Sequence, residues 1–442
     1  MEKKKKAKKE ICRIIDQNSK EIISTGEKLF TMPEKSFQEF ETSRFVGEIF
    51  KKGAIPFESG LAITGIRADL RGGKKGPVLA LLGELDALAV PSHPFADKHT
   101  GAAHACGHHA QLSGLLGAAL ALKKSGIMES LSGGIAFMAV PAEEINDINY
   151  RLSLKKAGRI TFLSGKQEFI RIGCFDDVDM AVMIHTGSGG GAGLAESYNG
   201  FVVKLSRFTG RASHSAAAPE LGINALQAAN LALTALNAQC ETYMDQDRVR
   251  VHSVIDIPSA AVNVITAEAV VETQVRAASI EAILGTAKKA DRALRSGAMA
   301  LGAKVAIETL PGYMPALQNK ALTDIYKKNA TSFIPEKDFF FHPPRSSSTD
   351  MGDVSQVVPS IHPYLGGAQG KAHSSDYEIK DKYMAYVLPA KVLAMCAIDL
   401  LWDDASAAKR IIKESKTPFT IKGYIELQKK NFHKAVYNYT GK

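Results

Sequence analysis

Three histidines and a cysteine crowd into residues 104–110, which spell HACGHHA. Thiolate and imidazole groups are preferred ligands of zinc, so this segment could hold a metal ion. A redox centre and a crowded helix start are the alternatives. The segment alone does not decide between them, so the other candidate ligands and the elements that position them carry the argument.

Further polar side chains follow three apolar runs that are typical of buried strands. They are Glu84 and Asp86 after the first run, Glu143 and Glu144 after the second, and His185 after the third. Each group alone has a structural interpretation, as solvated carboxylates or a packed histidine. In open α/β sheets, however, ligands bind beyond the carboxyl ends of the strands, and HACGH starts the helix between the first two runs. The shared location favours a metal site, in which one adjacent glutamate binds metal and the other takes a proton from water.

The elements that must position these groups alternate along the first half of the chain. Strands are predicted near residues 77–84, 133–140 and 177–185, and a helix over 108–126 that stops at Gly126. This alternation predicts a mostly parallel α/β sheet. From about Asn199 the order becomes β-α-β-β-α-β, the ferredoxin-like split unit. We therefore expect a catalytic domain in two parts, 1–198 and 312–442, with an inserted α+β domain over 199–311.

Composition narrows the functional classes. The 442 residues carry a formal net charge of +9, and no aromatic-interleaved basic stripe predicts nucleic-acid binding. No apolar run reaches the roughly 18–20 residues of a membrane span, and the basic N-terminus continues into a charged, periodic segment unlike a signal peptide. The five cysteines are scattered and lack CxxC spacing, which favours a reducing cytoplasm over a disulfide framework. There is no GxSxG elbow, and the glycine-rich segment 187–193 precedes no predicted helix.

A set of motifs in this order resembles a known family. GELDAL, HACGH, PAEE, MIHTG, GRASHSAAAPELGINAL, AVNVI, SSSTDMGDVS and AHSSDY are similar to motifs of the dimetal amidohydrolases and metallopeptidases that include aminoacylases, indole-acetyl-amino-acid hydrolases and glutamate carboxypeptidases. The resemblance covers roughly residues 30–400, and GELDAL and SSSTDMGDVS are most like the aminobenzoyl-glutamate hydrolase branch. It implies two divalent metal ions, Zn²⁺ or Mn²⁺, and an inserted lid domain that forms a homodimer. Whether a related second subunit takes part is left open.

The resemblance also implies a set of metal ligands. Cys106 would bridge the two ions. His108 and His185 would complete one site, and Glu144 and His373 the other.

Four further residues take roles by the same resemblance. Glu143 would be the general base, and His214 in the motif GRASHS would reach the substrate, often across the dimer, to stabilise the oxyanion. Asn263 and Arg276 would contact the substrate carboxylate. A guanidinium fits that task because its fork matches a carboxylate.

Two positions depart from the family pattern. His109 stands where relatives commonly have Asp or Asn, which leaves the orientation of His108 open. The first strand ends in Glu84, where carboxypeptidase relatives place a metal-binding histidine. We therefore expect His108 to replace that ligand, with Glu84 and Asp86 behind the ligands. His104 and His109 are expected to be structural or to support the ligands.

The predicted activity is metal-dependent hydrolysis of the amide bond of an N-acyl or N-aroyl amino acid, such as aminobenzoyl-glutamate, with release of the amino acid. A dipeptidase acting on unusual dipeptides is one alternative. A non-catalytic metal- or peptide-binding paralogue is another, and the presence of Glu143 argues against it. The expected partner is a small-molecule amide, with neither nucleic acid nor membrane involved.

Overall fold

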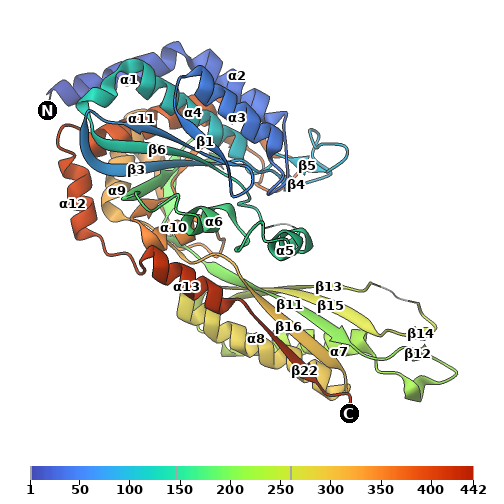
Figure 1. Cartoon of the computed structure of the whole chain (residues 1–442). Helices are drawn as coiled ribbons and strands as arrows, with labels where there is room; N and C mark the ends of the chain where they lie inside the picture. Colours follow the sequence, from blue (N-terminus) through green and yellow to red (C-terminus); the bar gives the residue numbers. More distant parts are fainter. Residues whose placement is uncertain (1, 146, 259–260, 442) are drawn as a thin grey trace. The chain divides into compact units, whose positions relative to one another are not determined.

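The computed structural model describes residues 2–145, 147–258 and 261–441 (Figure 1). The chain divides into two compact units. The first comprises Met1–Glu196, Leu317–Pro343 and Asp353–Ile421, and the second comprises Ser197–Ala316, Pro344–Gly352 and Lys422–Lys442. The second unit thus takes in two segments that lie outside the range 199–311 expected from the sequence.

A six-stranded sheet in the order β1-β2-β6-β3-β7-β19 lies at the centre of the first unit. Four strands run parallel, namely β6 (Ser132–Val140), β3 (Lys74–Glu84), β7 (Met180–Met183) and β19 (Ser360–Ile361). The edge strands β1 (Phe57–Leu61) and β2 (Gly65–Arg71) run antiparallel. The predicted mostly parallel α/β sheet is confirmed. Its apolar run Leu79–Leu82 is buried because β3 lies between β6 and β7.

Helices cover both faces of this sheet. Figure 1 shows α4 (His108–Ser125) and α11 (Leu388–Leu401) on one face and α6 (Gly165–Arg171) on the other. The predicted helix is confirmed, and it stops at Gly126, whose φ of 68° ends the helical backbone. The remaining helices of the first unit are α1 (Glu2–Gln17), α2 (Ser19–Phe30), α3 (Phe40–Lys52), α5 (Ile148–Lys156), α9 (Lys320–Ala330) and α12 (Ser406–Glu414); α10 spans Met351–Val357.

One helical stretch, Tyr383–Leu401, is long and apolar enough to cross a membrane. However, 94% of its most apolar window is buried inside the protein. Its partners include α1, α4 and α9, which is the packing of a core helix.

A second sheet of the first unit has the order β18-β9-β20-β21, and β8 pairs with β20. Its strands are β18 (Phe339–His342), β9 (Ala192–Ala195), β20 (Tyr364–Gln369), β21 (Glu378–Ile379) and β8 (His185–Ser188). The run predicted to be one strand ending at His185 is therefore split. It forms β7 in the central sheet, and His185 begins β8 in this second sheet. Short strands β4 (Leu88–Ala89) and β5 (Ala102–Ala103) pair with each other.

The second unit contains an antiparallel sheet in the order β13-β15-β11-β16-β22. Four of its strands form the predicted β-α-β-β-α-β unit with helices α7 (Ala225–Ala238) and α8 (Ile280–Ala300). These strands are β11 (Gly200–Thr209), β13 (Arg250–Asp256), β15 (Glu268–Ala277) and β16 (Lys304–Pro311). Apolar side chains of α7 and α8 form one core with the sheet. This arrangement is the ferredoxin-like topology.

The C-terminal segment adds to this sheet. After α13 (Ile421–Asn431), strand β22 (His433–Asn438) pairs antiparallel with β16. Strands β12 (Ser213–His214) and β14 (Val264–Ile265) form a separate two-stranded pair, and β10 (Ser197–Tyr198) and β17 (Ala316–Leu317) are further short strands.

Candidate metal centre and active site

The turn before α4 positions Cys106 and His108. Gly107 between them has a φ of +95°, and a Cβ atom there would come within 2.4 Å of the Tyr377 hydroxyl. Only glycine fits both the backbone and the space. The turn leaves the Cys106 Sγ 3.5 Å from Nε2 of His185, at the start of β8. Side chains from two distant segments thus meet beyond the end of the central sheet.

Both ring nitrogens of His108 have neighbours. Its Nδ1 lies 2.8 Å from the Asp86 backbone oxygen and 3.2 Å from Asp86 Oδ1. Its Nε2 lies 3.0 Å from Glu84 Oε2. When Nδ1–H donates to the carbonyl oxygen, Nε2 carries the lone pair and is the nitrogen available to a metal ion. Asp86 therefore has the supporting position that the sequence predicted, whereas Glu84 lies on the ligand side of the ring.

The loop after β6 presents Glu144. Its backbone N–H donates to Asp86 Oδ2 at 2.9 Å, and its backbone oxygen accepts from Ser36 Oγ at 2.8 Å and from the Arg151 guanidinium. Its side-chain Oε1 lies 3.1 Å from Nε2 of His373. Asp86 thus contacts both the His108 ring and the backbone of Glu144, so one carboxylate ties two candidate ligands together.

A second buried carboxylate, Glu39, holds the same loop from the other side. Its Oε1 accepts from the backbone N–H groups of Phe37 and Ala142 at 2.9 and 2.8 Å, and its Oε2 accepts from Thr64 Oγ1 at 2.6 Å. Ala142 has a φ of 56° and immediately precedes Glu143. Glu39 was not a candidate from the sequence, because nothing near it in the chain marks it.

The candidate ligand atoms form three overlapping groups. The ligand atoms of Cys106, His108 and His185 lie within 4.8 Å of one another, and so do those of Cys106, Glu144 and His373. The two groups share the Cys106 sulfur. In a third group Glu143 joins Glu84 and His108 within the same limit. The structure therefore brings together all the residues that the sequence predicted as ligands or base.

Charge in this centre is strongly coupled. Burial would raise the pKa of the Cys106 thiol, but the neighbouring His185 and His108 outweigh burial and hold it well below its usual value. Hydrogen bonds to Cys106 and Glu144 raise the pKa of His373 to about 10. Burial and the Cys106 charge raise the pKa of Glu144. The imidazoles thus compensate a concentration of buried negative charge.

Glu84 has a cationic partner that the sequence did not reveal. The Lys166 ammonium pairs with Glu84 Oε1, and both side chains are almost completely buried. Gln111 Nε2 donates to Oε2 at 2.8 Å. Burial would raise the pKa of Glu84, but Lys166 and His108 outweigh it and lower the pKa. Lys166 lies within α6, and its local sequence, SGKQEF, indicates only a helix start.

His104 and His109 form a separate buried pair beside the centre. Their ring centroids are 5.1 Å apart, and His109 packs against Phe30 at 5.1 Å and Tyr386 at 5.8 Å. Burial lowers the pKa of His104 to about 3 and that of His109 well below its usual value. Both are therefore neutral, so the carboxylate that relatives commonly have at this position is replaced by an uncharged ring.

His214, Asn263 and Arg276 all lie in the second unit. His214 is exposed in β12, and its Nδ1 accepts from the backbone N–H groups of residues 216 and 217 at 3.2 and 3.0 Å. The Asn263 backbone oxygen accepts from the Ser215 backbone N–H at 2.9 Å, which puts Asn263 beside His214. Arg276 lies on β15, where it donates to Gln274 and Ser348 and stacks on Phe201 at 5.1 Å.

The donor chemistry of the first unit fits two divalent metal ions. One thiolate, imidazole nitrogens and carboxylate oxygens are ligands that zinc accepts, and imidazole and carboxylate also suit manganese. The His108 Nδ1 contact with a backbone carbonyl is the outer contact that metal-bound histidines usually have. Buried carboxylates and a thiolate this close together also need positive charge.

Comparison with known proteins agrees with this chemistry. Residues 80–395 match the family described as Peptidase family M20/M25/M40. The chain is 29% identical to a Xaa-Arg dipeptidase of Mus musculus over 423 residues, 90% of each protein. It is 31% identical to one of the p-aminobenzoyl-glutamate hydrolase proteins of Escherichia coli over 305 residues, 66% of this chain and 64% of that protein. A dinuclear metal-binding peptidase of Bacillus subtilis has a similar fold, with a TM-score of 0.66 and 20% identity over 87% of this chain and 99% of the other.

Proposed function

Because the chain belongs to the peptidase family M20/M25/M40 and is a metal-dependent hydrolase of linear amides, we propose that it acts as a dipeptidase. Its proposed substrates are dipeptides with a free C-terminal carboxylate, and those ending in arginine are preferred. The observation that carries this choice is the similarity to a Xaa-Arg dipeptidase across 90% of both chains. The choice moves the weight from N-acyl amino acids to the dipeptidase alternative that the sequence left open.

Two groups of ligands would hold the metal ions. His108 and His185 would complete one site and Glu144 and His373 the other, with the Cys106 thiolate shared. Bound there, the ions would polarise the amide carbonyl and lower the pKa of water. Zn²⁺ and Mn²⁺ both remain candidates on donor chemistry.

Glu143 is the proposed general base. Its carboxylate lies within 4.8 Å of the His108 and Glu84 ligand atoms, so it is close to the place where water would be activated. Glu143 takes the proton from the attacking water and gives it to the nitrogen of the leaving amino acid. Asp86 and Glu39 keep this loop in place through the backbone contacts of Glu144 and Ala142.

The second unit is proposed to be a lid through which two copies form a homodimer. Its exposed His214 would donate to the oxyanion, in the partner's site, and Asn263 and Arg276 would bind the substrate carboxylate. The protein is proposed to work in the cytoplasm, since its five cysteines are all free thiols.

A second candidate is hydrolysis of N-acyl or N-aroyl amino acids such as aminobenzoyl-glutamate. The similarity to the E. coli hydrolase over 66% of this chain supports it. The two candidates share the same metal ligands and base, and they differ only in the group on the amino side of the scissile bond and in the released amino acid.

The deciding experiment compares kcat/KM for four substrates with Zn²⁺ or Mn²⁺ added: Ala-Arg, Ala-Glu, N-acetyl-Arg and p-aminobenzoyl-Glu. A dipeptidase preferring arginine should cleave Ala-Arg fastest, N-acetyl-Arg slowly and p-aminobenzoyl-Glu slowest. Faster cleavage of p-aminobenzoyl-Glu than of both dipeptides would establish the second candidate instead. No cleavage of any of the four by protein with two metals bound would contradict both.

A further inference from the structure

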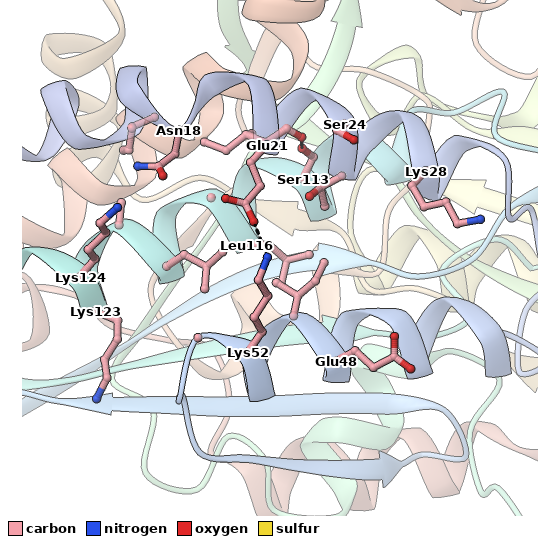
Figure 2. A pocket seen from close by; sticks show the side chains of 18 of the residues that line it. Asn18, Glu21, Ser24, Lys28, Glu48, Lys52, Ser113, Leu116, Lys123 and Lys124 are labelled. Atoms are coloured by element: carbon pink, nitrogen blue, oxygen red, sulfur yellow. Dashed lines mark hydrogen bonds and ion pairs between the residues drawn. The ribbon is translucent and has the colours of Figure 1, made fainter.

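A groove lies between α2, α3 and α4, within the first unit and apart from the candidate ligands. Its volume is about 770 Å³, which lies inside the range of small-molecule sites. Figure 2 shows α2 and α3 as its two walls, with α4 behind them. The same α4 begins at His108, five residues before the first groove residue on that helix, Ser113. We call this feature the α2–α3–α4 groove.

The floor of the groove is apolar. Side chains from all three helices and from the end of α1 form it: Ile15, Ile22, Phe45, Ile49, Leu116 and Leu120. Leu116 and Ile15 are buried, whereas Phe45, Ile49 and Leu120 remain partly accessible to solvent. A ligand that covered these partly accessible side chains would gain the free energy of removing apolar surface from water.

The rim of the groove carries positive charge. Four lysines and two glutamates line it, and the two acids already have basic partners. Glu21 pairs with Lys52 at 2.9 Å across the groove, as Figure 2 shows, and Glu48 pairs with Arg44 at 2.7 Å.

The other three rim lysines are free for a ligand. The ammonium groups of Lys28, Lys123 and Lys124 have no hydrogen bond or ion pair among the residues that the structure describes. In Figure 2, Lys123 and Lys124 lie at one end of the groove and Lys28 at the other. Each lysine also lies in the last turn of its helix, where a cation is favourable, but that preference explains neither the apolar floor nor the opening between the helices.

From this combination we infer that the α2–α3–α4 groove is a binding site for an amphipathic carboxylate, a hydrocarbon chain that ends in a carboxylate group. The chain lies on the apolar floor, and the carboxylate lies at the end that holds Lys123 and Lys124. A long amine is disfavoured because it would bring a positive charge to a rim whose acids are already paired.

The test is a titration of the full-length protein with octanoate, decanoate and dodecanoate, below their micelle-forming concentrations, by isothermal titration calorimetry. We expect one saturable site per chain. Each added pair of methylenes should tighten binding about 16-fold, or about fourfold per methylene, as long as the chain fits the groove. Dodecylamine and methyl dodecanoate are the probes for charge, and both should bind more weakly than dodecanoate.

Two variants localise the site. Thr25→Trp places a large ring in the groove wall and should abolish dodecanoate binding. Lys123→Gln with Lys124→Gln should weaken it roughly three- to tenfold. The matched control, Lys3→Gln with Lys5→Gln, removes the same charge from exposed positions on α1 at least ten residues, or about 15 Å, before Ile15, and should have no effect.

Three outcomes would overturn the inference. They are the absence of saturable dodecanoate binding, equal binding of dodecylamine, and unchanged affinity in Thr25→Trp protein with native circular dichroism. If sedimentation shows instead a concentration-dependent dimer that Thr25→Trp disrupts, the groove holds a second copy of the chain, and the small-anion assignment is wrong. If Thr25→Trp does not fold, the lysine pair and its control still decide whether the carboxylate lies at that end.

Discussion

Replacing Lys166 by methionine should destabilise the first unit more than any surface substitution. Lys166 and Glu84 are 0% and 1% exposed, so methionine fills the space of the lysine but leaves Glu84 as a buried charge without its ammonium. Removing one partner of a buried ion pair costs about 3–5 kcal/mol. For a unit of this size each kcal/mol lowers the unfolding temperature by about 2–4 °C, so we expect a fall of at least about 6 °C.

A double-mutant cycle separates the charge from the packing. Glu84→Gln removes the charge that Lys166 compensates, so adding it to Lys166→Met should restore about half or more of the lost unfolding temperature. The assay is differential scanning calorimetry of the wild type, both single variants and the double variant at the same pH. If the losses of the two single variants simply add in the double variant, the pair is not coupled and the ion-pair explanation of Glu84 is wrong.

Three other substitutions test separate features of the site. Cys106→Ser should lower the bound metal and abolish hydrolysis, because a serine hydroxyl stays protonated and bridges two cations poorly; full metal content with normal turnover would refute the shared-ligand role. Burial and the Asp86 charge raise the pKa of Glu39 to about 8, so the folded state keeps a proton that the unfolded state loses above about pH 4.5, and stability should fall by about 1.4 kcal/mol per pH unit up to pH 8. Glu39→Gln should therefore flatten the dependence of unfolding temperature on pH between 5 and 8, and an unchanged profile would show that Glu39 is ionised. Arg276→Ala should raise KM for Ala-Arg much more than for its C-terminal amide; equal effects would indicate a purely structural role.

Much of the catalytic framework could be predicted from local sequence. The apolar run before Glu84 and the helix that stops at Gly126 follow simple periodicity and turn rules, and the rule that ligands bind beyond parallel strands predicted that Cys106 lies near Glu144. The β-α-β-β-α-β order of the inserted unit was visible for the same reason.

What the sequence did not reveal depends on contacts between distant segments. Lys166 reaches Glu84 across 82 positions, and Glu39 reaches the Ala142 backbone across 103, so no local pattern marks either residue. The split between β7 and β8 has a related cause, because which sheet His185 joins depends on its pairing with Tyr364. Strand β22 likewise joins the second unit only through its pairing with β16.

The division of labour between the adjacent glutamates is tested most directly by measuring metal content and Ala-Arg hydrolysis on the same preparations of wild type, Glu143→Gln and Glu144→Gln. If the pair divides its work as proposed, Glu143→Gln keeps about two metal ions per chain and loses about 10²–10⁴-fold in kcat. Glu144→Gln, its matched neighbour, should lose metal together with activity. Identical metal content and identical rates in the two variants would contradict a site in which one glutamate binds metal and the other moves the proton.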